Sequence, residues 1–116
     1  KGEPAQARDW YLQAIVEAPH LREPYMDLAL MLYEQGEWEG VLYFTACALA
    51  ITRRPRSYIC EAESWGSLPH DLRALALYNI GAYARAAEEA RRALELEPDS
   101  GRLRENLRLM EQAAGV

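Results

Sequence analysis

The sequence is poor in several features that would point to particular classes of protein. Its 116 residues include two cysteines and two histidines, and none of its apolar runs approaches the roughly 18 residues that span a bilayer. Two cysteines are too few for a disulfide scaffold, so we expect free thiols in a reducing compartment and a cytoplasmic protein. The net charge of −5, with the basic charge scattered, argues against a nucleic-acid partner.

Signatures of catalysis and of cofactor binding are also lacking. The glycines are isolated, so no loop resembles a phosphate cradle. His20 and His70 lie far apart, without cysteines or carboxylates at ligand spacing around them, which argues against a metal site. Cys60 and His70 are poor candidates for a nucleophile pair, and Glu88–Glu89 is interpreted as solvated surface. We therefore predict no catalytic residue, no cofactor and no metal, and a chain that is not an enzyme.

What the sequence does contain is a repeated pattern of two amphipathic helices around a tight turn. Pro24–Ile51 and Pro69–Pro98 each follow this pattern, and residues 1–19 match its second half. Gly36 and Gly81 lie where the first helix of each pair should end, which is the usual position of a C-terminal glycine. Stacked helix pairs form a groove, so the pattern predicts a binding or scaffolding role.

The spacing of the copies is that of a known repeat family. Ala14 and Ala48 occupy equivalent positions 34 residues apart, whereas Ala48 and Ala93 are 45 apart, so the second interval carries 11 extra residues. This period and pattern resemble those of the tetratricopeptide family. The resemblance implies an all-α, right-handed α-solenoid of antiparallel helix pairs. The residues that carry it are Tyr25, Leu28, Ala29, Leu32, Gly36, Ala48, Gly81, Ala82, Tyr83, Ala86, Ala90, Ala93 and Pro98.

We expect these copies to form a single domain. Residues 1–19 would be the second helix of a truncated repeat, as in a piece of a longer chain. A repeat over 20–51, an irregular insert over 52–68 and a second repeat over 69–98 would follow. Residues 99–116, with a helix over Gly101–Ala114, would form a C-terminal cap that covers the last apolar face. The apolar stripe of that helix consists of Leu103, Leu107 and Met110.

The insert over residues 52–68 has two compatible interpretations. Tyr58, Ile59 and Trp65 could fold back to fill the widened gap between the repeats, with a helical turn over Glu61–Trp65. Alternatively, the loop could line or close the groove, because long loops in compact domains are often functional.

Three segments resemble the C-terminal repeat region of bacterial family 2 glycosyltransferases, namely Leu21–Tyr25, Ala48–Pro55 and Glu61–Leu72. In that family, a nucleotide-sugar transferase domain precedes tetratricopeptide-like repeats. The resemblance implies a transferase parent but places no catalytic residue in this sequence. The Asp-x-Asp element with which such enzymes hold metal and nucleotide sugar does not occur in the 116 residues.

The tetratricopeptide resemblance implies that the first helix of each pair lines a concave groove, and helical periodicity then identifies the outward side chains of those helices. They are Glu23, Met26, Asp27, Leu30 and Tyr33 in one helix and Asp71, Leu75, Tyr78 and Asn79 in the next. Family members that bind acidic chaperone tails carry lysine, arginine and asparagine in the groove, so that ligand is not expected here. A basic or amphipathic segment suits the carboxylates better. The same surface could instead pack on neighbouring repeats or on a parent's catalytic domain.

Three functions follow from this pattern. The leading one is a non-catalytic scaffold that forms the C-terminal part of a family 2 glycosyltransferase and holds a protein or peptide partner. The alternatives are a stand-alone adaptor that binds a peptide in its groove and an oligomerisation module that forms a homo-oligomer.

Overall fold

The computed structural model describes residues 4–54 and 62–115, and within these ranges the fold is all-α, as predicted. Six of the described helices have 12 to 14 residues, and a seventh is a single turn. The helices are α1 (Pro4–Glu17), α2 (Arg22–Glu34), α3 (Trp38–Ala50), α4 (Ala62–Trp65), α5 (Leu68–Asn79), α6 (Tyr83–Leu96) and α7 (Gly101–Ala114).

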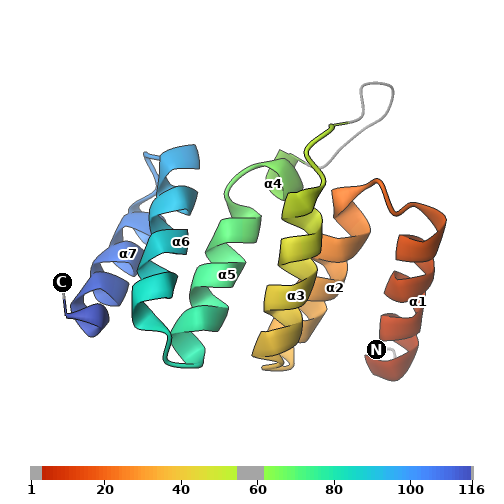
Figure 1. Ribbon diagram of the computed structural model, residues 1–116, viewed down its shortest axis with the longest axis horizontal. Coiled ribbons are helices and arrows are strands. Elements are labelled where there is room, and N and C mark those ends of the chain that lie inside the picture. The colour runs from red at the N-terminus through yellow and green to blue at the C-terminus, as the bar shows by residue number, and fades with distance from the viewer. Residues whose placement is uncertain (1–3, 55–61, 116) are drawn as a thin grey trace.

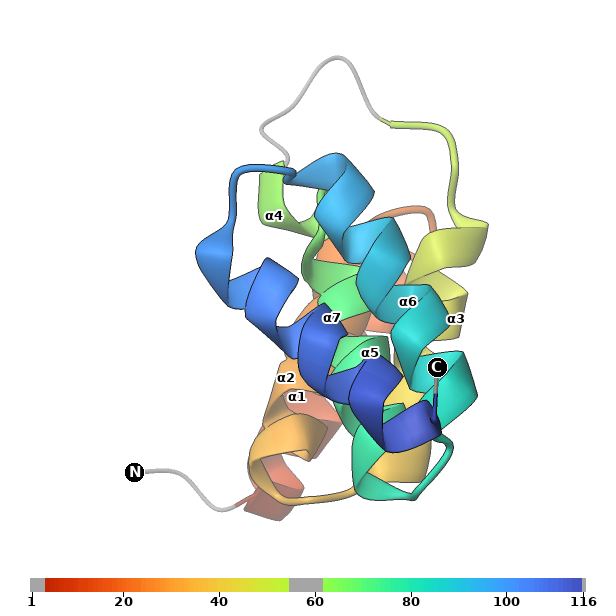
Figure 2. The same cartoon turned by 90° about the vertical axis from the view of Figure 1, so that its left-hand side faces the viewer.

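The long helices pack side by side in chain order along the longest axis of the molecule (Figure 1). Each contacts the one before and the one after it, and α5 also contacts α2. The short helix α4 packs against α2 and α5. Seen end-on, α3 and α6 lie on one side of the row and α2 and α7 on the other (Figure 2). Residues of α2, α5 and α7 nonetheless share one face of the row, because they line a common pocket there.

The same turn joins α2 to α3 and α5 to α6. Gly36 and Gly81 have φ values of +73° and +88°, the left-handed region that only glycine enters at little cost. The residue after each glycine donates its N–H to a carbonyl five residues earlier, from Glu37 to Leu32 and from Ala82 to Leu77, both at 2.9 Å. Both turns are Schellman motifs, which satisfy the last carbonyls of a helix. The role predicted for the two glycines is confirmed.

Small side chains allow the paired helices to approach closely. Ala29 and Ala74 are at most 1 % exposed, and the later positions Ala48 and Ala93 are fully buried. At Gly40 a Cβ atom would come within 2.7 Å of the Leu32 side chain, so a methyl group there would force that side chain to move at the contact between α2 and α3. Close packing of this kind contributes dispersion energy over the whole length of each pair.

The final helix spans the residues predicted for it. Its N-cap, Ser100, accepts a hydrogen bond from the Leu103 N–H at 3.2 Å, which satisfies one of the free donors of the first turn. Leu103 and Met110 are buried and Leu107 packs beside them, as the predicted apolar stripe requires. Because α7 packs against α6, this stripe covers the apolar side of the second helix pair.

One interpretation of the sequence is wrong. Glu89 is 8 % exposed rather than solvated, since α5 and α6 bring a histidine and two arginines to it. His70 Nδ1 lies 2.8 Å and Arg73 Nε 3.3 Å from its carboxylate oxygens, and the exposed Arg92 lies 3.5 Å away. Burial would raise the pKa of Glu89, but the hydrogen bond from His70 and the charge of Arg73 outweigh it and lower the pKa. Arg73 also donates to the Leu42 carbonyl, so the cluster links α5, α6 and α3.

Candidate functional site

Most of the side chains predicted for the groove reach the surface, but Met26 and Asp71 are buried. Met26 is 1 % exposed and belongs to the core cluster between α2, α3 and α5. The reason is that α2 contacts helices on several sides, so a side chain on its outward face by periodicity still meets a neighbour. Met26 is therefore a core residue and not part of an accessible groove.

The remaining α2 residues, Glu23, Asp27, Leu30 and Tyr33, are half-buried. Tyr33 packs edge-on against Trp38 across the α2–α3 turn, with 5.5 Å between the ring centroids. Such an arrangement fixes the ring while leaving part of it available for contact.

The predicted groove residues of α5 become more exposed towards the α5–α6 turn. Leu75 is half-buried, whereas Tyr78 and Asn79 are exposed. Tyr78 packs against Tyr83 with 5.3 Å between the centroids, and the Asn79 side chain donates to the Leu75 carbonyl at 2.8 Å. Each helix pair thus carries one aromatic pair at its turn.

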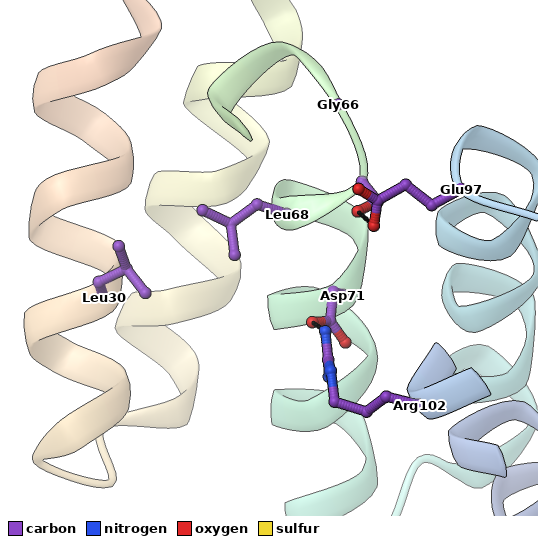
Figure 3. A pocket seen from close by; sticks show the side chains of 7 residues that line it. Leu30, Gly66, Leu68, Asp71, Glu97 and Arg102 are labelled. Carbon is purple, nitrogen blue, oxygen red and sulfur yellow. Dashed lines mark hydrogen bonds and ion pairs between the residues drawn. The ribbon is translucent and has the colours of Figure 1, made fainter. Parts of the chain in front are cut away.

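A pocket of about 490 Å³ opens on the face of α2, α5 and α7 (Figure 3). Leu30 and Leu68 point towards each other from α2 and α5 and form its apolar side. Its other side is polar. The full lining consists of Leu30, Gly66, Ser67, Leu68, Asp71, Glu97 and Arg102.

Two long-range hydrogen bonds build the polar side of the pocket. Arg102 on α7 reaches Asp71 on α5 at 2.8 Å. The hydroxyl of Ser67, just before α5, donates to Glu97 at the end of α6, also at 2.8 Å. Together the two contacts hold the start of α5 against the link between α6 and α7.

The electrostatics of the Asp71–Arg102 pair follow from its position. The Asp71 side chain is 8 % exposed, while that of Arg102 is 60 % exposed. The hydrogen bond to Asp71 raises the pKa of Arg102, against the opposing effect of partial burial. The charges of Glu97 and Tyr33 raise the pKa of the same guanidinium by smaller amounts.

Arg22 at the start of α2 anchors the residues on either side of the link between α3 and α4. Its guanidinium donates to the carbonyls of Ile51 and Ser64, at 2.8 and 3.0 Å, and lies 4.0 Å from the centroid of the Trp65 ring. Burial lowers the pKa of Arg22, and the charge of Glu23 opposes that shift. These contacts, called the Arg22 clamp below, tie the residue before the insert, Ile51, to Ser64 and Trp65 within it.

The described part of the insert shows features of both interpretations. Trp65 folds back onto α2, while the next three residues, Gly66 to Leu68, line the pocket. Tyr58 and Ile59 lie outside the described residues.

Sequence reasoning missed Ser67, Glu97 and Arg102 as parts of the site. Each is separated from its partner by about 30 residues, and no local pattern marks such a pairing. A signal was nonetheless present, because Ser67 and Asp71 are polar residues on the face that was assigned to the groove. A search for complementary charges two helices further along the chain, on α7, would have included Arg102.

The described residues show no arrangement for metal chemistry. Within residues 4–54 and 62–115, histidine, cysteine and carboxylate side chains do not gather in groups of three or more that could hold a metal ion. None of the helices in these ranges combines the length and the apolar character needed to cross a membrane.

The pocket on the face of α2, α5 and α7 offers hydrogen bonds, charged groups and apolar contact to a bound group.

Comparison with known proteins assigns no family. No protein-family model matches the chain, and the search of curated proteins finds no significant match.

Proposed function

We propose that this chain is a non-catalytic scaffold of the tetratricopeptide type, a right-handed α-solenoid that binds a protein or peptide segment along the face of α2, α5 and α7. The observation that carries the proposal is the pocket on that face, with apolar and charged walls supplied by three different helices. Two equivalent helix–turn–helix units, each with a Schellman turn and an aromatic pair, support it. Extended segments are commonly held by surfaces of this mixed chemistry.

The test is a selection of random peptides by phage display on the folded chain. Peptides that bind the proposed face should bind more weakly to Tyr33→Ala and Tyr78→Ala, because both remove aromatic contact area. The matched control is Tyr43→Ala, since Tyr43 is equally large and 63 % exposed but lies on α3. Peptides that bind all three variants as tightly as the parent would contradict the proposal.

A second function, self-association, is favoured by the exposed side of α1. Trp10 and Val16 are 77 % and 72 % exposed, although large apolar side chains usually avoid such exposure. A homo-oligomer, or packing against a catalytic domain of the same parent chain, would cover them. Light scattering should then show association that Trp10→Ser weakens, and a monomer at high concentration would remove the homo-oligomer.

The transferase parent stays a prediction from the sequence resemblance. Its test is the coding sequence upstream of Lys1, which should encode a nucleotide-sugar domain with an Asp-x-Asp element. An upstream sequence without such a domain would remove the link, while the proposed peptide-binding role would stand.

A further inference from the structure

The pocket of Figure 3 has two chemically distinct halves. Leu30 and Leu68 supply the apolar half, and Glu97 and Asp71 supply carboxylates to the polar half. The two halves face one open volume of about 490 Å³, which is enough for one long side chain. An occupant that satisfies both halves needs an apolar stem and a polar end.

The charge balance of the pocket selects the sign of that polar end. Two carboxylates and one guanidinium line the cavity, so its formal charge is −1. Arg102 is committed to Asp71 at 2.8 Å, and the Asp71 side chain is nearly covered. Glu97 is exposed, and its contact in the pocket is with the neutral hydroxyl of Ser67. A cation that enters the pocket can therefore pair with Glu97, whereas an anion meets two carboxylates and a single guanidinium whose charge Asp71 already offsets.

We propose that this pocket is a subsite for a lysine or arginine side chain of the bound segment. The aliphatic stem lies between Leu30 and Leu68, and the charged end pairs with Glu97. Long basic side chains pack their stems on apolar surface and keep their charge in a polar setting. The inference rests on the proposed peptide-binding function and names the residue type that the face selects.

Nuclear magnetic resonance with three capped heptapeptides tests the subsite. The peptides share the sequence Ser-Ala-Leu-X-Ala-Leu-Ser and carry lysine, Nε-acetyl-lysine or glutamate at X. The lysine peptide should shift the amide signals of Gly66 and Ser67 in a saturable manner. The acetyl-lysine and glutamate peptides should bind about three- to fivefold more weakly, since a partly exposed charge pair is worth that much.

A matched pair of protein variants assigns the effect to one carboxylate. Glu97→Gln keeps an acceptor for Ser67 but removes the charge, and it should abolish the preference for lysine. Glu95→Gln removes one charge from an exposed position on the same helix outside the pocket and should leave the preference unchanged. Melting temperatures report whether each variant is folded, and the peptide comparison on the parent chain needs no variant.

Several outcomes would overturn the subsite. Equal binding of the lysine and acetyl-lysine peptides, the tightest binding by the glutamate peptide, or an undiminished preference in Glu97→Gln would each do so. Absence of shifts at Gly66 and Ser67 would do so as well. The broader proposal is judged separately, by whether selected peptides depend on Tyr33 and Tyr78.

Discussion

The two helix pairs, α2–α3 and α5–α6, share a backbone plan but differ in the side chains that face the preceding helix. In the first pair, Leu28 and Phe44 line a crevice against α1 together with Leu12. The equivalent positions of the second pair, 45 residues later, are Arg73 and Glu89, which form an ion pair and reach α3. The unit is therefore fixed by its turns and small residues, while the surface between units accepts either apolar or ionic packing.

The largest expected effect comes from the position that both pairs bury alike. Leu32 and Leu77 precede the two glycine turns and are 5 % and 0 % exposed. Substitution of either by alanine should lower the free energy of unfolding by about 3 kcal/mol, because each leaves a cavity in close packing. Urea unfolding measures both. A difference of more than about 2 kcal/mol between them would contradict the equivalence of the pairs.

The second largest loss of stability is expected from the ionic cluster of the second pair, which consists of His70, Arg73 and Glu89. Glu89→Gln should cost about 2 kcal/mol at neutral pH, since it leaves His70 and Arg73 without their anion. Glu88→Gln, which changes an exposed neighbour, should cost less than about 0.5 kcal/mol. Urea unfolding of the two variants compares them directly.

The pH dependence of this contribution has a definite sign. The pKa of Glu89 is lowered in the folded state, so its stabilisation is complete above the ordinary value of 4.5 and is lost as the pH falls towards the lowered pKa. The difference in unfolding free energy between the parent and Glu89→Gln should therefore shrink below pH 4.5. A difference that stays constant down to acid pH would show that charge is not its cause.

A smaller and equal effect is expected at the two turns. Gly36→Ala and Gly81→Ala should each cost about 1 kcal/mol, because alanine is disfavoured at positive φ. Neither site is crowded, since an added Cβ would meet no atom closer than 3.8 Å, so the cost arises in the backbone alone. Thermal unfolding followed by circular dichroism measures both. A neutral result at one glycine would show that its turn is not required.

The smallest net change is expected from exchanging the chemistry of one pair for that of the other. The triple variant His70→Tyr, Arg73→Leu and Glu89→Phe places at these three positions of α5 and α6 the residues found at the equivalent positions of α2 and α3. Its stability at neutral pH should stay within about 1 kcal/mol of the parent, because apolar side chains can replace a buried ion pair. Urea unfolding measures the change, and a larger loss of stability would show that apolar side chains do not replace the ionic cluster in this pair.

Local signals in the sequence were enough to predict the helices and their turns. The turns at Gly36 and Gly81 and the helix faces that carry the buried alanines are determined by residues close together in sequence, so periodicity and spacing predict them. Met26 and Glu89 could not be placed in this way. Their burial depends on contacts with helices that are distant in sequence. Met26 packs against α5, and Glu89 pairs with His70 and Arg73 of α5.

The site shows the same division between local and long-range information. The assignment of Leu30 and Asp71 to one face followed from helical periodicity combined with the tetratricopeptide resemblance. The pairing of Asp71 with Arg102 depends on how α7 returns to α5, which periodicity within a single helix does not encode. Charge complementarity between helices is the information that would have to be added.

The clamp formed by Arg22 gives the chain a natural point for protein engineering. Because one side chain holds the carbonyls of Ile51 and Ser64, the two ends of the intervening segment stay together whatever its length. Closing a flexible loop of twice the length costs only about 0.6 kcal/mol. A foreign epitope or a binding peptide grafted between these ends should therefore leave the helix row intact, next to a pocket whose wall begins two residues after the clamp.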